Sequence, residues 1–466
     1  MSQRYYYQKY YRSRSRSHKK YYDQNYDYKN YNDNNRRQYA PVQKKKNYDY
    51  YNQDNMIMIG TIIGIKIIVI EMITIIIMIE NIQEIVQKEI TSHSRSSSSN
   101  SSSNSSNNSA QSDSKNRSKD AGHYKYKKGE TFDNGRYILI KHLSDGTFGR
   151  VFEVVDSHNN NKTIALKVIR AVDRYVEAAQ TEGDIIMKIN KMDPEDQYRI
   201  VRLYNTFKHQ ENFCMCFEKL GLSLFDLLKK NNYVPYKIQY VKSFFKQILE
   251  SIGFLHLLKL THTDLKPENI LLVSSELKKS EIKCGKTSSP STSYQSIKII
   301  DFGGATFENE HHSDIINTRQ YRAPEVILGC MRWNEISDVW SIGCIIMELY
   351  SGELLFPTHE NYEHLAMIEK ISGHIPKWMG NRAEHDHFSQ NFNVSDEYFS
   401  KYRTHFDWPK NASSRKSIER VRELITVEQI IKPEHYLLKD LVKKCLIIDP
   451  KQRISCQEAL KHSFFQ

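Results

Sequence analysis

The sequence has little cysteine, and none of it is arranged as a zinc site or a redox pair. It carries 7 cysteines among 466 residues, and no two of them form a C-x-x-C pair. Most lie among apolar residues, which is typical of reduced thiols in a protein core. The pattern therefore favours an intracellular protein without disulfides or structural zinc.

The apolar run at Met56–Ile79 is too far from the N-terminus for an ordinary signal peptide, and no internal repeat is visible. Acidic residues are the minority: 67 Lys and Arg face 55 Asp and Glu, for a net charge of +12. A basic excess can indicate nucleic-acid, acidic-lipid or acidic-protein partners. Much of this excess lies in the N-terminal tail, so we expect no direct nucleic-acid partner.

Composition divides the chain into four segments. Residues 1–55 form a Tyr-rich, basic tail with an Arg-Ser run at 12–17 and no aliphatic periodicity, so we expect disorder there. Residues 56–90 are Ile-rich and apolar, and residues 91–121 are a Ser/Asn-rich linker. Residues 122–466 have the composition of a globular domain.

The most informative segment runs from Thr261 to Asn269 and reads T-H-T-D-L-K-P-E-N. It resembles the protein-kinase catalytic loop H-R-D-L-x-x-x-N, in which the Asp accepts a proton from the substrate hydroxyl and the Asn binds a metal ion. Asp264 and Asn269 keep that spacing. Lys266 is placed to neutralise charge on the transferred phosphoryl group. Thr263 replaces the usual Arg.

A glycine-containing turn is predicted between two strands within residues 137–155. It has the position of a kinase glycine-rich loop, whose backbone N–H groups approach the phosphates of ATP. Gly146 and Gly149 keep two of the three glycines, and Ser144 stands at the first. Val151 follows in the second strand. We expect all four residues to lie at the ATP site.

Lys167 lies in the apolar run I-A-L-K-V, which matches the kinase V-A-I-K strand. A lysine among apolar strand residues needs a partner. We expect Lys167 to contact the α- and β-phosphates and to pair with an acidic residue on the next helix. Glu182 is the best candidate because nearby apolar positions put it on the inner face. Glu177 and Asp184 are its rivals.

Asp301 follows a buried strand and opens the sequence Asp-Phe-Gly. With Asn269 it is expected to hold the Mg²⁺ that bridges the β- and γ-phosphates. Glu325 ends an A-P-E motif and is expected to pair with Arg453. Asp338 heads an apolar helix, where it caps the helix, braces the backbone of the catalytic loop, or does both.

Further ATP contacts are expected where an apolar strand ends near residue 217. Phe217 has the position of a kinase gatekeeper, and Glu218 and Leu220 follow in the segment that binds adenine. The remaining predicted ATP contacts are Ala165 and Leu271.

Three segments carry a closer resemblance: H-T-D-L-K-P-E-N at 262–269, S-D-I-I-N-T-R-Q-Y-R-A-P-E at 313–325, and E-H-L-A-M-I-E-K at 363–370. Over about residues 130–466 the chain resembles the LAMMER, or CDC2-like (CLK), dual-specificity kinases. Their motif E-H-L-A-M-M-E-R appears here with Ile368 for Met and Lys370 for Arg. We expect the motif helix to have a structural role in the larger lobe.

The resemblance implies an α+β, bilobal protein-kinase fold. A small β-rich N-lobe is expected at about residues 137–220, and a large, mostly helical C-lobe at about residues 221–466. An insert at residues 274–296 is expected to form a surface hairpin.

The resemblance also implies an activity. It implies ATP- and Mg²⁺-dependent phosphorylation of protein substrates, Arg/Ser-rich splicing factors, together with autophosphorylation on Ser, Thr and Tyr. It further implies a nuclear location, and we expect a monomer. Glu268 is a candidate acceptor for substrate arginines. The tail's Arg-Ser run fits as a substrate, docking segment or localisation signal, and a solvated charged tail is the alternative.

Two other functions compete with this one. Met56–Ile79 is long enough to span a bilayer, although Lys66 and Glu71 would each cost about 2.5–3.5 kcal/mol near a helix centre. The basic residues before it favour a cytoplasmic N-terminus, which would separate the kinase domain from ATP. A membrane-associated kinase is therefore not favoured, and a buried helix, a β-prone insert or an error in the gene model are the alternatives.

A pseudokinase scaffold is disfavoured because the predicted catalytic and metal-binding residues are all present.

Thr263 also bears on regulation. In many kinases the Arg at this position binds a phosphate on the activation loop. A threonine side chain cannot do so, and the segment from Asp301 to Glu325 is short. The sequence therefore predicts basal activity without phosphorylation of this segment.

Overall fold

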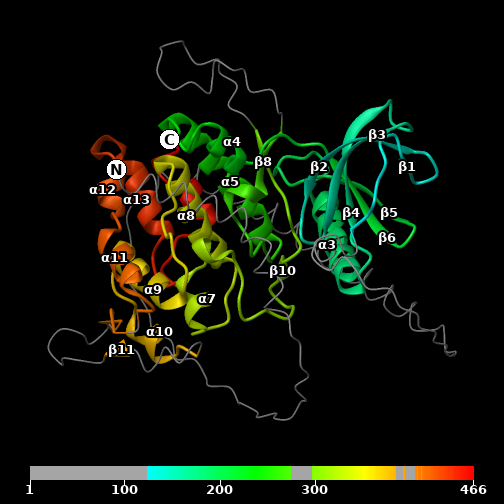
Figure 1. Cartoon of the computed structure of the whole chain (residues 1–466). Helices are drawn as coiled ribbons and strands as arrows, with labels where there is room; N and C mark the ends of the chain where they lie inside the picture. Colours follow the sequence, from blue (N-terminus) through cyan, green and yellow to red (C-terminus); the bar gives the residue numbers. More distant parts are fainter. Residues whose placement is uncertain (1–122, 274–295, 385–391, 394–404, 407, 411) are drawn as a thin grey trace, which may run out of the picture. The chain divides into compact units, whose positions relative to one another are not determined.

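The computed structural model of the chain describes residues 123–273, 296–384, 392–393, 405–406, 408–410 and 412–466 (Figure 1). These residues fall within one compact unit. The tail, Ile-rich segment and linker predicted at residues 1–55, 56–90 and 91–121 lie outside the described residues. Nearly all of the insert predicted at residues 274–296 does so too.

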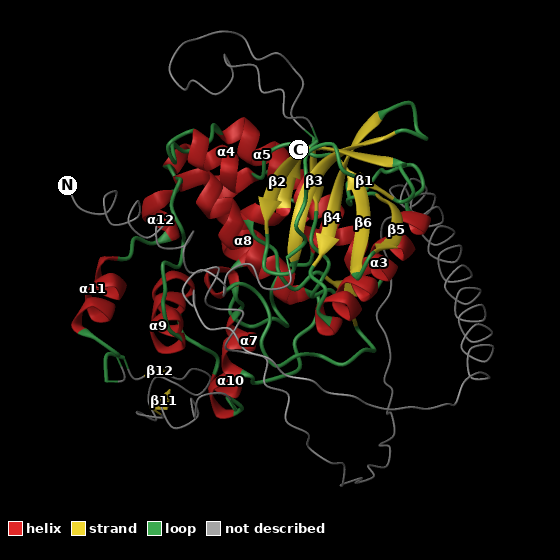
Figure 2. Ribbon diagram, turned by 45° about the vertical axis from the view of Figure 1, so that its right-hand side comes forward, coloured by secondary structure: helices red, strands yellow, loops and turns green. Residues whose placement is uncertain are grey.

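Six antiparallel strands form one sheet in the order β1-β2-β3-β4-β6-β5 (Figure 2). Alternate residues of β4 are buried, as expected of a strand with two different faces: Ile164, Leu166 and Val168 point into one core. The two strands predicted within residues 137–155 are confirmed as β2 and β3. The strands are β1 Thr131–Phe132, β2 Tyr137–Asp145, β3 Gly149–Asp156, β4 Lys162–Ile169, β5 Leu203–His209 and β6 Asn212–Glu218.

One long helix, α3 (Asp173–Met192), packs beside this sheet. Its buried positions include Ile185, Ile186 and Ile189, which recur at the three- and four-residue spacing of one helix face. Each fully buried isoleucine contributes about 1.5–3 kcal/mol, so this face holds the helix in place. Glu182 lies on the same buried face.

The second lobe is mainly helical (Figure 1). Its centre is α5 packed against α8, and α8 is buried along almost its whole length, polar side chains such as Asp338 and Glu348 included. The helices are α4 Leu224–Lys230, α5 Ile238–Leu257, α7 Pro324–Leu328, α8 Ile336–Ser351, α9 Asn361–Ser372, α10 Lys377–Asn381, α11 Arg415–Glu423, α12 Val427–Ile430, α13 Tyr436–Cys445 and α14 Cys456–Leu460; single 3-10 turns are η1 Pro267–Asn269, η2 Arg319–Tyr321 and η4 Pro433–His435.

Short strand pairs bring the two central motifs together. β7 pairs with β10, and β8 pairs with β9. The catalytic-loop run lies between β7 and β8, and Asp-Phe-Gly follows β9, so these two pairings hold both motifs side by side. The third pair, β11 with β12, lies elsewhere in this lobe. The strands are β7 Leu260–Thr261, β8 Ile270–Leu272, β9 Ile297–Ile299, β10 Thr306–Phe307, β11 Phe392–Asn393 and β12 His405–Phe406.

This arrangement confirms the predicted bilobal α+β fold, with a sheet-rich first lobe and a helical second lobe. The six cysteines that the structure describes are free and buried, as predicted. In the described ranges, no helix combines the length and hydropathy needed to cross a membrane.

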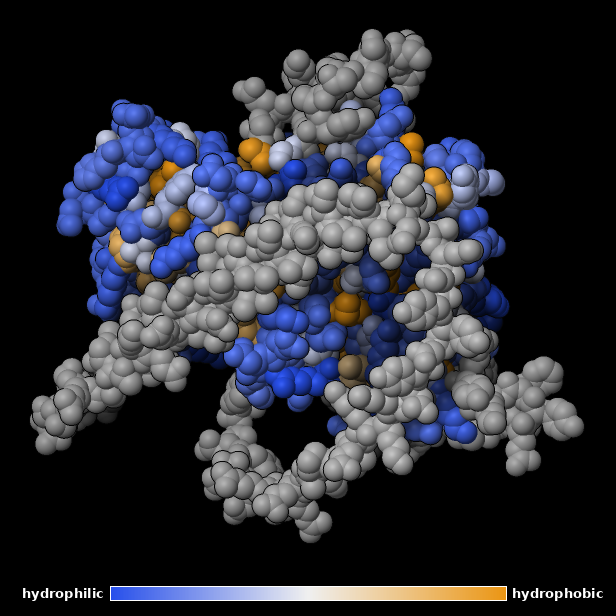
Figure 3. Space-filling model, turned by 180° about the vertical axis from the view of Figure 1, so that it is seen from behind, coloured by the Kyte–Doolittle hydropathy of each residue, from blue (hydrophilic) through white to orange (hydrophobic). Residues whose placement is uncertain are grey.

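One face of the described part is mostly hydrophilic, with apolar residues in small separate patches (Figure 3). The exposed large apolar side chains belong to different elements, for example Leu257 in α5, Ile315 before η2 and Tyr436 in α13. Single exposed apolar residues of this kind are ordinary on protein surfaces and do not by themselves indicate an interface.

Candidate active site

Lys167 and Glu182 form the predicted ion pair between β4 and α3. Lys167 Nζ donates to Glu182 Oε2 at 2.6 Å. Burial alone would lower the pKa of Lys167, but the carboxylates of Glu182 and Asp301 raise it above its usual value. The rivals Glu177 and Asp184 are exposed on α3. The charges of the Glu182 and Asp301 carboxylates therefore keep the lysine protonated.

The Asp-Phe-Gly segment is tied to this ion pair. Phe302 is fully buried, its ring lies 5.1 Å from that of His262, and its backbone N–H donates to Glu182. His262 Nε2 lies 3.0 Å from the carbonyl oxygen of Ile300. Protein kinases need both the Lys–Glu pair and the Asp of Asp-Phe-Gly in place for catalysis, and the structure shows both.

Asp264, within the catalytic loop, is held by donors from Thr318 and Lys266. Its Oδ1 accepts the backbone N–H of Thr318 at 2.9 Å and the Thr318 hydroxyl at 2.7 Å. Its Oδ2 pairs with Lys266 Nζ, which also contacts Thr318 Oγ1 at 3.2 Å. Burial would raise the pKa of Asp264, but Lys266 and Thr318 together bring it below its usual value. Asp264 is therefore ionised and positioned to accept a proton.

Thr318 is a functional residue that the sequence did not single out. It stands in the quoted segment S-D-I-I-N-T-R-Q-Y-R-A-P-E, which served only to identify the family. Thr318 and Asp264 are 54 positions apart, so no local pattern reveals their contact. A hydroxyl residue shortly before the A-P-E motif was the one available signal.

Asp338 braces the catalytic loop, as one of its two predicted roles required. Its Oδ2 accepts the N–H of His262 at 2.8 Å, and its Oδ1 accepts the N–H of Thr263 at 3.1 Å. The side chain of Asp338 is fully buried. The capping alternative is wrong, because α8 begins at Ile336 with Glu335 as its cap residue.

Thr263 joins the catalytic loop to the segment after Asp-Phe-Gly. Its backbone has a φ of 70°, in the left-handed region. Its hydroxyl donates to the carbonyl oxygen of Gly304 at 2.7 Å, and its own carbonyl accepts the N–H of Asn317 at 2.8 Å. The residue that replaces Arg therefore makes direct contacts with residues 301–325, the activation segment.

Asn269 and Asp301 form a donor set suited to a divalent cation. Asn269 Nδ2 donates to the carbonyl oxygen of Asp264 at 2.9 Å, which turns its amide oxygen the other way. Asp301 is exposed and has a φ of 71°. Among described residues no cluster of three His, Cys, Asp or Glu could hold a metal alone. One carboxylate and one amide oxygen fit Mg²⁺, which usually adds waters and substrate phosphates to few protein ligands.

The glycine-rich turn is built as a hairpin. Gly146 N–H donates to the carbonyl oxygen of Gly149 at 2.8 Å. A Cβ on Gly149 would lie 2.2 Å from the carbonyl oxygen of Val168, so β3 can approach β4 only if this residue is glycine. Ser144 lies near the exposed end of β2. The structure thus gives Gly149 a packing role besides any approach to phosphate.

Most of the side chains predicted to lie near adenine share one face of the sheet, and Leu271 belongs to the other lobe. Val151 pairs with Lys167, and Phe217 pairs with Ala165. Directly opposed residues share a face, so these four side chains face the same way. Leu271, in β8 of the other lobe, is half-buried and bridges to Ser223.

Glu218 and Leu220 follow at the end of β6. The Glu218 side chain alternates to the other face of the sheet, and its N–H donates to the carbonyl oxygen of Arg202 at 3.0 Å. Leu220 is half-buried just beyond the strand.

The helix that carries E-H-L-A-M-I-E-K is α9, and it is structural, as predicted. Glu363 is fully buried and pairs with Arg420. Lys370 Nζ donates to the carbonyl oxygens of Val421 at 2.9 Å and Arg422 at 2.6 Å. Both ends of the motif therefore fasten α9 to α11.

The predicted pair of Glu325 and Arg453 is also confirmed. The Arg453 guanidinium donates to both carboxylate oxygens of Glu325, at 2.7 and 2.8 Å. Both side chains are almost fully buried. The pair anchors the end of the activation segment to the second lobe.

Residues 137–465 match the family model described as protein kinase domain. The chain therefore belongs to the protein kinase family, whose members use ATP with a divalent cation to phosphorylate proteins. Its relatives place it more narrowly, among the LAMMER or CDC2-like kinases.

These relatives include "Dual specificity protein kinase CLK2" of Homo sapiens, 42% identical over 348 residues, 74% of this chain and 66% of the relative. "Serine/threonine-protein kinase AFC1" of Arabidopsis thaliana is 43% identical over 74% of this chain and 73% of its own length. A crystal structure of a kinase domain is 40% identical, with a TM-score of 0.66, and covers 74% of this chain and 100% of that domain. The chain thus spans just under two thirds of human CLK2.

Proposed function

We propose that this protein is a dual-specificity kinase that transfers the γ-phosphoryl group of ATP to Ser and Thr, and to Tyr at least by autophosphorylation. The observation that carries the proposal is Asp264, held ionised between Thr318 and Lys266 beside an assembled Lys167–Glu182 pair. Relatives named dual-specificity kinases support it.

The residues divide the chemistry among them. Asp264 orients the substrate hydroxyl and takes its proton as the oxygen attacks phosphorus. Lys266 lies next to Asp264, where its charge offsets the negative charge that develops on the transferred group. Lys167, fixed by Glu182, binds the α- and β-phosphates. Each group is already in position, so little reorganisation is needed in the transition state.

The metal in this proposal is Mg²⁺, held by Asn269 and Asp301. When bound there, the cation would supply positive charge that neutralises part of the charge on the phosphates of ATP. Substituting Asp301 by Asn should abolish Mg²⁺-dependent tightening of ATP binding, measured by calorimetry with and without the metal. Unchanged tightening would place the metal elsewhere.

For substrates we propose Arg/Ser-rich splicing factors, phosphorylated in the nucleus by a monomeric enzyme. The resemblance to LAMMER kinases and the chain's own Arg-Ser run at residues 12–17 support this. Glu268 lies in η1 directly beside the catalytic loop, where its carboxylate adds negative charge near Lys266. A carboxylate at this place suits a substrate arginine.

The test is a phosphotransfer assay of the full chain with Mg-ATP on an Arg-Ser peptide and on a matched neutral peptide. We expect faster transfer to the Arg-Ser peptide, with the Asp264→Asn variant as the blank. A wild-type transfer rate no higher than that of the Asp264→Asn blank would refute the kinase proposal. Glu268→Ala with unchanged preference for the Arg-Ser peptide would remove Glu268 from substrate recognition.

A further inference from the structure

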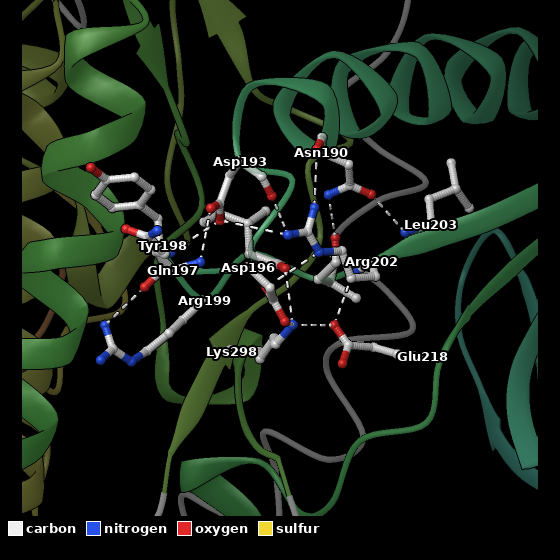
Figure 4. Close-up of polar contacts among 12 residues, drawn as sticks. Asn190, Asp193, Asp196, Gln197, Tyr198, Arg199, Arg202, Leu203, Glu218 and Lys298 are labelled. Atoms are coloured by element: carbon white, nitrogen blue, oxygen red, sulfur yellow. Dashed lines mark hydrogen bonds and ion pairs between the residues drawn. The ribbon is translucent and has the colours of Figure 1, made fainter. Parts of the chain in front are cut away.

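A buried network of charged side chains lies behind the predicted adenine site (Figure 4). At its centre is Lys298 in β9, whose side chain is 5% exposed. Its Nζ donates to Glu218 Oε1 at 2.6 Å, pairs with the Asp196 carboxylate, and lies 3.4 Å from the carbonyl oxygen of Ile200. A buried lysine is stable only when it is paired in this way, and here two carboxylates share it.

One branch of the network reaches the strand end that carries the adenine contacts. Glu218 Oε1 accepts the backbone N–H of Arg202 at 2.8 Å besides bonding Lys298. The Glu218 N–H donates to the Arg202 carbonyl oxygen at 3.0 Å. Glu218 is therefore fixed through both its backbone and its side chain, one residue after Phe217.

A second branch reaches the end of α3, the helix that carries Glu182. The Arg202 guanidinium donates to the carbonyl oxygens of Asn190, at 3.1 Å, and Asp193. Its Nε lies 3.3 Å from Asp196 Oδ1. Asn190 in turn donates to the carbonyl oxygen of Val201 at 3.1 Å. The loop after α3 is thus cross-linked to the last turn of the helix.

The third branch is the strand that leads to the metal-binding motif. Lys298 stands three residues before Asp301. Backbone bonds join β9 to the same loop, because Val201 N–H donates to the Ile299 carbonyl oxygen at 3.1 Å and Ile299 N–H to the Arg199 carbonyl oxygen at 2.9 Å. The loop after α3 is therefore joined to β9 through a single parallel bridge between Ile200 and Ile299.

We propose that Lys298 is a positioning residue for ATP, which holds the adenine-binding strand end, α3 and the Asp301 strand in one relative arrangement. Removing its charge leaves the Glu218 and Asp196 carboxylates, 15% and 36% exposed, without the cation that pairs with both of them. Glu218 must then move toward water or another donor, and the backbone from Phe217 to Leu220 moves with it. ATP binding weakens as a result. The inference rests on the proposed kinase function but does not depend on which protein is the substrate.

The test compares full-length Lys298→Met with wild type by ADP calorimetry and by steady-state kinetics. We expect ADP affinity to fall, and KM for ATP to rise, about tenfold, the scale of one lost buried charged hydrogen bond. KM for the peptide should stay within about twofold, because the peptide-side groups are not in the network. Lys208→Met is the matched control, since Lys208 forms an exposed pair with Glu211 and should change neither quantity.

A double-mutant cycle separates positioning from general stability. Glu218→Gln alone should weaken ADP binding, and Lys298→Met with Glu218→Gln should weaken it by less than the product of the two single effects, because neither charge is then left unpaired. If Lys298→Met does not fold, Glu218→Gln and Asp196→Asn carry the test. Glu218→Gln should then have the larger effect, because Asp196 is 36% exposed and water can replace its partner.

Several outcomes would overturn the proposal. One is a folded Lys298→Met that melts earlier but binds ADP like wild type, which would make the network merely structural. Wild-type ADP affinity in Glu218→Gln, or single effects that multiply fully in the double variant, would also refute it. ADP binding needs no phosphotransfer. An inactive wild-type chain would therefore refute the kinase proposal, while the effect of Lys298 on ADP affinity could still be measured.

Discussion

At the scale of single residues, Thr318 sets the state of the catalytic Asp264. It supplies two of the hydrogen bonds to Asp264 Oδ1, and these bonds favour the ionised carboxylate. Thr318→Val keeps the size of the side chain and the backbone bond but removes the hydroxyl. We expect kcat to fall about 10- to 100-fold, the range for one hydrogen bond to a charged group, while KM for ATP is unchanged.

The same change should move the pH profile. Loss of the hydroxyl raises the pKa of Asp264 from its lowered value, so the acid limb of kcat/KM should shift to higher pH in Thr318→Val. Thr318→Ser, which keeps the hydroxyl, is the control and should restore both rate and profile. A pH profile identical in Thr318→Val and wild type would show that the hydroxyl does not act on Asp264.

His364 makes a separate prediction about stability. It is fully buried in α9, and neither ring nitrogen has a hydrogen-bond partner among the described residues. Burial, and then the charges of Arg322 and Arg319, lower the pKa of His364 well below its usual value. The unfolded chain therefore binds a proton here below about pH 6.5 that the folded chain does not. The contribution of His364 to the free energy of unfolding is therefore complete above that pH and decreases as the pH falls.

We expect His364→Leu to reduce this acid sensitivity. In wild type the group contributes a slope of up to about 1.4 kcal/mol per pH unit below pH 6.5. Urea unfolding of both proteins between pH 5 and pH 7.5 gives the difference, in which contributions from other titrating groups cancel. A difference in unfolding free energy that does not vary with pH would mean that His364 is protonated, or paired, in the folded protein.

At the scale of elements, internal hydrogen bonds hold the activation segment. Arg322 Nε donates to the Ile316 carbonyl oxygen at 2.8 Å, and its Nη2 donates to that of Asn317 at 2.9 Å. Trp333 Nε1 donates to the Ser313 carbonyl oxygen at 2.7 Å. Together with the Thr263 contacts, these bonds hold the segment through its own residues, whereas many kinases order it with a phosphate.

Phosphatase treatment should therefore leave the enzyme active. We expect the dephosphorylated full chain to retain at least half of its rate on a peptide substrate, because internal donors already order the segment. Mass spectrometry should confirm that no phosphate remains on residues 301–325. A kinase known to need activation-loop phosphate, treated in parallel, provides the control. Loss of activity that returns on rephosphorylation would contradict the prediction.

The sequence could predict the elements whose functional residues lie close together in the chain, at fixed spacings within short motifs. The catalytic loop, the Asp-Phe-Gly strand and the choice of Glu182 over its rivals all depended on local order and on the inner face of one helix. Asp338 left two roles open because a carboxylate near a helix start suits either. The contacts of Thr318 and of Lys298 were missed because their partners lie 54 and 102 positions away, and only tertiary packing brings them together.

At the scale of the whole molecule, α3 joins the two lobes. Its buried isoleucines belong to the same hydrophobic core as α5 and α8, whereas the outer face of the sheet has a separate core that includes Phe132, Tyr137 and Phe152. The outer core can therefore stabilise the sheet without bearing on α3. Changes that reach the active site should act through α3 and the network around Lys298.

The remaining prediction concerns where the whole chain acts. If Met56–Ile79 crossed a membrane, the basic residues before it would favour a cytoplasmic N-terminus, and the kinase domain would then be separated from cytosolic and nuclear ATP. Phosphotransfer and a simple span are thus mutually exclusive for this topology. We expect a fluorescent fusion of the full chain to enter the nucleus, and a fusion lacking residues 56–79 to do the same. Full-length protein that stays in membranes after carbonate extraction, while the deletion variant becomes extractable, would contradict the prediction and show that residues 56–79 anchor the chain in a membrane.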